Sequence, residues 1–142
     1  MTRYYLDTSI WLDLFEDRNS RGKLAAALIE KIIKEDSEVY YSDITITELK
    51  STGYYNAEIR DKYKPFRQIL VYASSDRKEM GKAEDISEKR GIPKGDVLHA
   101  IIARRYRCIL VADDRHFQKL RDILHPKRPT DIIEDDVFFQ VP

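Results

Sequence analysis

The sequence predicts an α/β fold in which a mostly parallel sheet lies between two layers of helices. Short runs of strand-forming residues alternate along the chain with stretches whose apolar residues recur at helical spacing. This alternation is typical of parallel sheets, because a parallel strand pair needs a crossover that is usually a helix. The clearest buried strand is the apolar run at residues 108–112. We therefore expect a three-layer α/β/α architecture in one domain that covers residues 1–142.

The composition fits a single soluble domain. Lys and Arg total 25, as do Asp and Glu, so the net charge does not by itself indicate a nucleic-acid or membrane partner. The single cysteine, Cys108, excludes an intrachain disulfide and a Cys-rich zinc site. No apolar run approaches the ~20 residues that a membrane span needs, and the first residues do not resemble a signal peptide. We expect a soluble, cytoplasmic protein with no membrane partner.

The chain opens with a strand that leads directly into a helix. Residues 3–6 are dominated by strand formers, and the apolar residues after Asp7 recur at helical spacing from Ile10 to Phe15. Asp7 is therefore expected at the C-terminal end of a strand, at the sheet edge where α/β proteins usually bind ligands. Ser9 is well placed to cap the helix.

A second amphipathic helix is predicted from residue 24 to near residue 36, and a second strand at residues 38–42. Asp43 or Thr45 is expected to cap a third helix, which carries Glu48. Beyond it, the pattern becomes irregular until the next strand.

Residues 54–67 show no clean period, and Pro65 excludes a continuous helix there. The apolar run at 69–72 fits a short strand or a helix end, and we favour the strand. The polar residues 74–76 are then expected to cap a helix that ends at Gly91, a residue that commonly follows a helix C-terminus.

Asp96 is predicted at the start of a further helix, after a turn at residues 92–95. The buried strand at 108–112 ends at two consecutive aspartates, and apolar residues at helical spacing follow from 117 to 123. Apolar residues at 132–133 and 137–139 predict that the tail docks on the domain.

Carboxylates stand at several element ends beside apolar runs. The two that directly follow strands meet at one edge if the strands are parallel, and the two on helices must close over that edge. The residues concerned are Asp7, Glu48, Asp96 and Asp114. Oxygen ligands without cysteine suit Mg²⁺ or Mn²⁺, which can activate water for attack on a phosphate. Taken singly, each acid is also explained as a helix cap or a solvated surface group, although a strand-end Asp7 followed by two hydroxyl residues is not required for folding.

Four segments together resemble the PIN domain family. They match in order and spacing across nearly the whole chain, and they are Leu6-Asp7-Thr8-Ser9, Thr47-Glu48-Leu49, Gly91 to Ala103 and Leu110 to Phe117. The resemblance implies a fold similar to FLAP-type nucleases and cleavage of RNA with Mg²⁺ or Mn²⁺. Many small members are VapC-type toxins, so it also implies a VapB-like antitoxin partner and a homodimer.

Carried over position by position, the resemblance implies that four acids are catalytic and metal-binding: Asp7, Glu48, Asp96 and Asp114. Ala112 stands where the family often has Thr or Ser, so a hydroxyl that would position metal-bound water is absent. The choice between Asp113 and Asp114 as the fourth acid stays open. Thr8 or Ser9 is expected to orient Asp7 or a metal-bound water.

Other residues invite functional readings that have structural alternatives. His99 and His116 are interpreted as a packed histidine and as part of the turn after the last strand. Basic and aromatic residues alternate in the segment 54–67, a combination that suits single-stranded RNA. A solvated face with buried aromatic rings explains that segment equally well.

Three functions compete on the sequence alone. The first is a metal-dependent ribonuclease, the toxin of a type II toxin-antitoxin pair, in which metal-activated water attacks the phosphodiester. The second is a PIN-fold module that binds RNA or protein without catalysis, which Ala112 favours. The third, another phosphoryl-transfer enzyme such as a phosphatase, is disfavoured because no second acid lies two residues after Asp7 and no Gly-rich phosphate loop appears.

Overall fold

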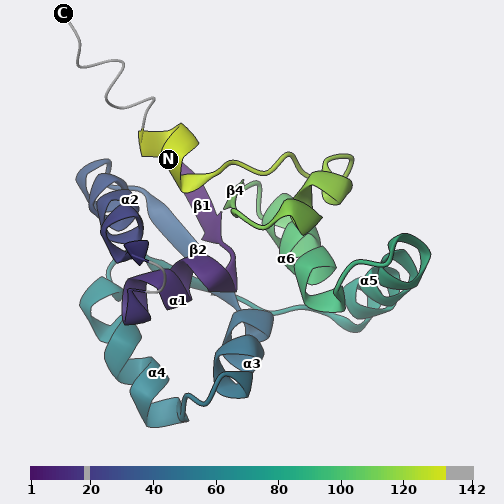
Figure 1. Cartoon of the computed structure of the whole chain (residues 1–142), viewed down its shortest axis with the longest axis horizontal. Helices are drawn as coiled ribbons and strands as arrows, with labels where there is room; N and C mark the ends of the chain where they lie inside the picture. The colour runs from purple at the N-terminus through teal and green to yellow at the C-terminus, as the bar shows by residue number, and fades with distance from the viewer. Residues whose placement is uncertain (18–19, 134–142) are drawn as a thin grey trace, which may run out of the picture.

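One parallel sheet forms the centre of the computed structural model, which describes residues 1–17 and 20–133 (Figure 1). In these ranges the sheet has four strands, in the spatial order β3 (Leu70–Ala73), β2 (Glu38–Ser42), β1 (Arg3–Leu6) and β4 (Ile109–Val111). Every neighbouring pair is parallel. The strands predicted from the alternation of patterns are therefore confirmed, including the one at 69–72.

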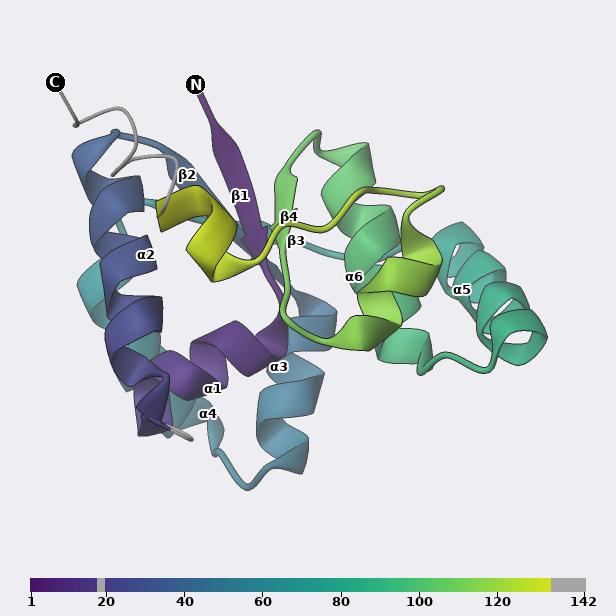
Figure 2. The same ribbon diagram turned by 45° about the horizontal axis from the view of Figure 1, so that its top comes forward.

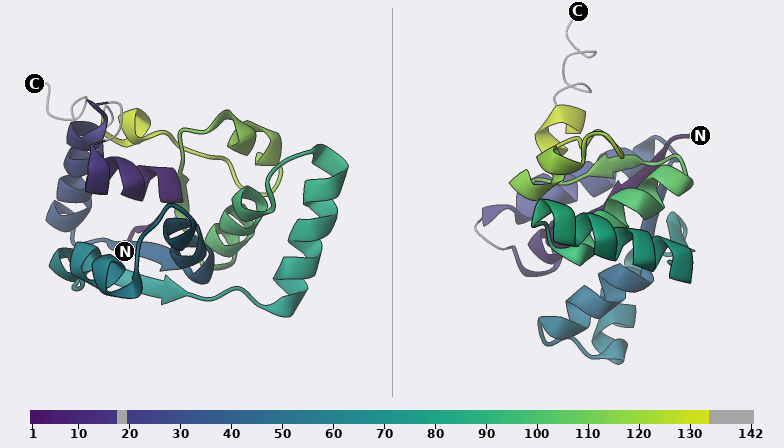
Figure 3. Two further views of the ribbon diagram at one scale, coloured as in Figure 1. Left: turned by 60° about the horizontal axis from the view of Figure 1, so that its bottom comes forward. Right: turned by 90° about the vertical axis from the view of Figure 1, so that its right-hand side faces the viewer.

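Helices cover both faces of the sheet, which confirms the predicted three layers (Figures 1 and 3). One layer holds α1 (Thr8–Glu16), α2 (Gly22–Lys34) and α4 (Asn56–Tyr63). The other holds α5 (Arg77–Arg90) and α6 (Lys94–Arg105), with α5 on the outer side of α6, away from the sheet. The remaining elements are α3 (Asp43–Ser51), which begins where β2 ends, and the short 3₁₀ helices η2 (Lys64–Phe66) and η3 (Arg115–Leu120).

The core is divided in two by β1, because successive side chains of a strand point to opposite faces. Tyr4 and Leu6 pack into the cluster beneath α1 and α2, and Tyr5 packs into the cluster beneath α6. On β2, Val39 and Tyr40 divide in the same way. Burial on both faces explains why the chain begins with a run of strand-forming apolar and aromatic residues.

Two predicted helix caps are wrong. Ser42, rather than Asp43 or Thr45, caps α3: its hydroxyl accepts the N–H of Thr45 at 3.4 Å, and the Thr45 hydroxyl accepts the N–H of Ser42 at 3.1 Å. Ser9 does not cap α1, whose N-cap position is Asp7. The residue that caps α3 is thus one position before Asp43. The Ser9 hydroxyl donates to the Asp7 carboxylate instead of capping α1.

The caps of α5 are as predicted. Asp76 accepts the N–H of Glu79 at 2.7 Å, and Gly91 ends the helix with φ +63°, a left-handed conformation that favours glycine. The irregular segment 54–67 folds as α4 and η2, with Pro65 in the 3₁₀ turn.

The segment after β4 differs from the expected α-helix, because η3 is a 3₁₀ helix. Asp114 accepts the N–H of His116 at 2.8 Å and so holds its first turn tight. Residues 129–133 are helical, and Ile132 packs into the cluster with α2, which confirms docking of this part of the tail (Figure 2). The predicted docking of 137–139 lies outside the described residues. Among the described helices, none combines the length and apolar character needed to cross a membrane.

Candidate metal and catalytic site

The first and last predicted acids lie at the same edge of the sheet. Asp7 follows β1 and Asp114 follows β4, and these two strands pair directly, with Leu6 opposite Val111. The N–H of Asp7 donates to the carbonyl of Val111 at 2.9 Å, so the pairing continues to the edge. Asp7 is buried, whereas Asp114 remains exposed.

Two helices close over this edge, as expected. Asp96 lies in the first turn of α6, and Glu48 lies in α3. The helices approach closely at Gly95, where an added Cβ would lie 3.0 Å from Oε2 of Glu48. Glycine at this position therefore makes room for the Glu48 carboxylate.

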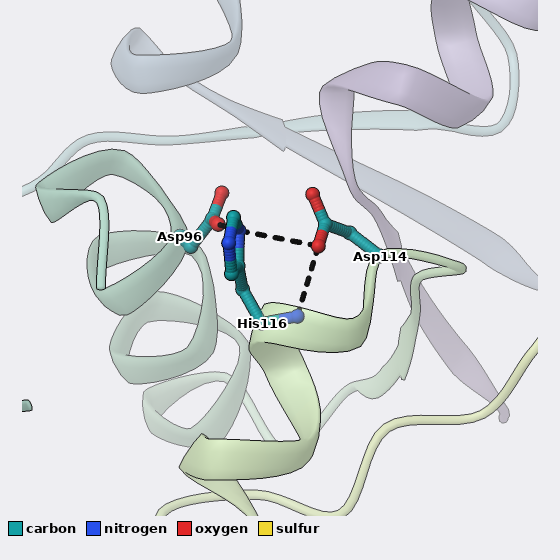
Figure 4. Close-up of side chains that lie close together, drawn as sticks. All are labelled: Asp96, Asp114 and His116. Carbon is teal, nitrogen blue, oxygen red and sulfur yellow. Dashed lines mark hydrogen bonds and ion pairs between the residues drawn. The ribbon is translucent and has the colours of Figure 1, made fainter. Parts of the chain in front are cut away.

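His116 joins the acids through its ring. Its Nδ1 lies 3.2 Å from Oδ2 of Asp96 and 3.2 Å from Oδ1 of Asp114 (Figure 4). Donor atoms of these three side chains all lie within 4.8 Å of one another. His116 belongs to the turn after β4, as predicted, but its part in this cluster was missed. A histidine two residues after a strand-end acid, at the start of a helical turn, was the available signal.

Asp96 interacts electrostatically with the other three acids. Burial, together with the negative charges of Asp7, Asp114 and Glu48, raises the pKa of Asp96 to about 6 against the opposing charge of His99. Burial also raises the pKa of Asp7. The sequence-predicted acids are therefore brought together, close enough to disfavour their simultaneous ionisation.

His99 is fully buried and lies between the sheet and the acids. Its Nε2 forms a hydrogen bond with Oε1 of Glu48, and its Nδ1 lies 2.6 Å from the Tyr5 hydroxyl. Burial lowers the pKa of His99, but its neighbours Tyr5, Glu48 and Asp7 raise it well above the usual value. These neighbours favour the protonated form of His99, in which Nε2 donates to Glu48 and a positive charge lies among the acids.

The two hydroxyl residues after Asp7 contact different acids. Ser9 donates to Oδ2 of Asp7 at 2.6 Å, so its role is to orient Asp7 and not to cap α1. Thr8 donates to Oε1 of Glu48 at 2.8 Å. Hydrogen bonds from His99 and Thr8 lower the pKa of Glu48 although burial raises it, so Glu48 is held ionised.

The structure separates Asp113 from Asp114. Asp113 forms an ion pair with Arg21, whose Nε also lies 3.4 Å from Oδ2 of Asp13. Asp113 therefore interacts with the start of α2, whereas Asp114 faces His116 and Asp96.

Comparison with known proteins places this geometry in a family. A model of the PIN domain matches residues 4–123, which include all the acids described above. The chain belongs to the PIN domain family. The fold of this PIN domain is also similar to a chain in the crystal structure of VapBC2 from Rickettsia felis bound to a DNA fragment from their promoter. That match has a TM-score of 0.66 and 21% identity, and it covers 89% of this chain and 98% of the other. No curated protein matches the chain.

The donor set of this PIN domain fits a divalent cation. Carboxylate oxygens suit Mg²⁺ and Mn²⁺, and an imidazole nitrogen such as Nδ1 of His116 adds affinity for Mn²⁺. Because the other carboxylates raise the pKa of Asp96, a bound cation would also favour its ionised form. These residues are therefore suited to hold a metal between α6 and the end of β4.

Proposed function

We propose that this PIN domain is a metal-dependent ribonuclease that hydrolyses RNA phosphodiester bonds. The observation that carries the proposal is the group formed by Asp96, Asp114 and His116, whose donor atoms lie within 4.8 Å of one another. Asp7 and Glu48 act electrostatically on the same group. Such a set of oxygen-rich ligands at the C-terminal edge of a parallel sheet supports phosphoryl-transfer chemistry.

The roles of the chain's own residues follow from their contacts. We assign metal binding and catalysis to four acids: Asp7, Glu48, Asp96 and Asp114. When bound, Mg²⁺ or Mn²⁺ would supply an activated water and offset negative charge on the phosphate. Ser9 fixes the Asp7 carboxylate through Oδ2, and His99 with Thr8 fixes Glu48 through Oε1. These hydrogen bonds keep the ligands in place before substrate arrives.

Replacement of single acids tests the proposal. Asp7→Asn and Asp96→Asn should each reduce Mg²⁺-dependent cleavage of single-stranded RNA by more than about 100-fold, since even a group that only orients a metal ligand is worth 10–100-fold. The far-UV circular dichroism should be unchanged. Asp113→Asn is the matched control, because Asp113 pairs with Arg21 outside the acid cluster. Undiminished cleavage in both Asp7→Asn and Asp96→Asn would overturn the assignment.

We further propose that the chain acts as a single-domain VapC-type toxin, with a VapB-like antitoxin and as a homodimer. The likeness of its fold to a chain of the VapBC2 complex supports this choice among PIN domains. The reading frame next to the gene should then encode a short DNA-binding protein. Its co-expression should relieve the growth arrest caused by the toxin, and growth arrest that persists would count against the pairing.

A non-catalytic binding module is the second candidate. Ala112 is buried at the end of β4 and offers no hydroxyl toward the acids. Titration with Mn²⁺ distinguishes the two functions, because a ligand that binds only the folded state raises the unfolding temperature. If Mn²⁺ raises the unfolding temperature of the wild type but not of Asp96→Asn, the ribonuclease is supported. If Mn²⁺ leaves the unfolding temperature of the wild type unchanged, the binding module is supported.

A further inference from the structure

A hollow of about 880 Å³ lies on the side of the sheet covered by α4. Residues of β2, β3, α3, α4 and η2 line it, and those used below are Tyr41, Tyr63, Tyr72, Arg60, Lys64 and Arg67. This volume is within the ~300–1,000 Å³ range of small-ligand sites. The hollow is therefore large enough for a nucleotide.

Three tyrosine rings form a series that runs from the core to the surface. Tyr63 is buried, and its ring packs edge-on against Trp11 with centroids 4.7 Å apart. Tyr41 stacks on Tyr63 at 5.0 Å with an interplanar angle of 22°, and Tyr72 follows at 5.3 Å from Tyr41. Tyr72 is 53% exposed. The inner rings hold the outer ring in place, and that outer ring is accessible to a further aromatic group.

Basic side chains surround the same hollow. Arg60, Lys64 and Arg67 are exposed, and none of them forms an ion pair with the residues that the structure describes. Asp61 is the acid among the lining residues. The positive charge of this rim is therefore available to an anionic ligand.

We propose that the hollow binds single-stranded RNA, with a base stacked on Tyr72 and phosphates held by Arg60, Lys64 and Arg67. An acidic peptide would satisfy the basic rim, but it would leave the exposed ring without a partner, so the combination favours a nucleic acid. Stacking on tyrosine accepts any base, so binding here is tolerant of sequence.

The proposal rests on the ribonuclease function and places the hollow as a subsite for RNA outside the acid cluster. The helix α3 contributes to both places, with Ile46 in the hollow and Glu48 among the acids. The aromatic residues of the segment 54–67 do not provide the stacking ring. Tyr63 is buried, Phe66 and Tyr54 pack against the core, and Tyr55 is exposed but does not line the hollow. The stacking ring comes from β3, whereas the basic residues come from α4, from η2 and from the residue after η2.

Fluorescence anisotropy with a labelled oligouridylate in EDTA tests the proposal without cleavage. Tyr72→Ala should weaken binding about tenfold, and Tyr72→Phe should retain it, because the ring provides the stacking. Tyr55→Ala is the matched control, since Tyr55 is 77% exposed and does not line the hollow. Equal affinity of Tyr72→Ala and the wild type would overturn the proposal.

The salt dependence tests the phosphate contacts separately. Lys64→Gln should reduce the slope of log affinity against log salt by about 0.7, the value for one phosphate contact on a single strand. Lys62→Gln on the neighbouring part of α4 should leave the slope unchanged, since Lys62 lies outside the lining. An equal change in both variants would mean that general charge, and not this rim, holds the RNA.

Competition distinguishes RNA from an acidic partner. Polyglutamate should displace the oligouridylate only at a large excess, and its own binding should not depend on Tyr72. Polyglutamate that binds more tightly than RNA would overturn the proposal in favour of an acidic peptide. Because these assays need no cleavage, a wild-type protein that binds RNA here but fails to cut it would count against the ribonuclease function alone.

Discussion

The hydroxyl of Tyr5 lies 2.6 Å from Nδ1 of His99, and this buried contact joins the central strand to α6. The same hydroxyl lies 2.7 Å from Oγ of Ser42, the residue that caps α3. On its other ring nitrogen, His99 bonds Glu48. A continuous set of hydrogen bonds therefore connects the core of the sheet with the acid cluster.

Tyr5→Phe should lower the free energy of unfolding by about 1–3 kcal/mol, because it leaves the buried Nδ1 of His99 without its hydrogen-bond partner. Urea denaturation followed by circular dichroism measures this change. Tyr40→Phe is the control, since Tyr40 is also buried on the same face but its hydroxyl forms no hydrogen bond with the described residues. If the free energy of unfolding fell equally in both variants, the contact between Tyr5 and His99 would not itself stabilise the fold.

Gly95→Ala should weaken Mn²⁺ binding about tenfold, because the new methyl group would lie 3.0 Å from Oε2 of Glu48 and displace that carboxylate. Isothermal titration calorimetry measures the affinity. Gly81→Ala in α5 meets no atom within 4 Å, so it should leave Mn²⁺ binding unchanged and stabilise the helix by up to about 1 kcal/mol. If Gly95→Ala binds Mn²⁺ with normal affinity, metal binding does not require the Glu48 carboxylate at its position beside α6.

The stability of the metal-free protein should depend on pH through Asp96. Its pKa is about 6 in the folded chain, against about 3.9 for an unfolded aspartate. The folded state therefore binds the proton more tightly, and this contribution to stability is lost as the pH rises through 6. At pH 7.5, Asp96→Asn should be more stable than the wild type by about 1–3 kcal/mol. At pH 5 this difference in stability should be smaller.

Urea denaturation in EDTA at the two pH values measures the difference. Asp122→Asn is the opposite control, because Arg90 lowers the pKa of the Asp122 carboxyl and that contribution is lost as the pH falls. If the difference in the free energy of unfolding between Asp96→Asn and the wild type is the same at both pH values, the pKa of Asp96 is not raised in the folded state.

His116→Ala should weaken Mn²⁺ binding by about tenfold or more and Mg²⁺ binding by less, because imidazole nitrogen suits Mn²⁺ while Mg²⁺ prefers oxygen. Calorimetric titration with each cation gives the ratio. His125→Ala is the matched control, since His125 contacts Arg121 outside the cluster. Equal losses for the two cations would exclude direct ligation by Nδ1 of His116.

Much of the fold follows from local patterns. The apolar runs that became β1 and β4 are short and end at acids, and parallel pairing then places Asp7 and Asp114 at one edge. This needs only the period of a strand and the direction of the chain. The caps show the limit of such reasoning: Ser42 and Asp43 are adjacent, and the backbone angle at the end of β2 decides which of them caps the helix.

The contacts within the site depend on long-range packing. Asp113 and Asp114 are neighbours of the same type, and they separate because Arg21, far away in sequence, meets only one of them. The ring of His116 faces Asp96 because α6 docks beside η3.

By itself, the sequence determined the alternation of strands and helices, the family, and the set of acids at one edge of the sheet. The tertiary structure alone decided that His99 bonds Glu48 among those acids, that His116 joins them, and that Tyr72 lies beside the basic residues of α4 and η2. Periodicity reports which face of an element is buried, whereas the partner of each polar side chain depends on how separate elements pack together.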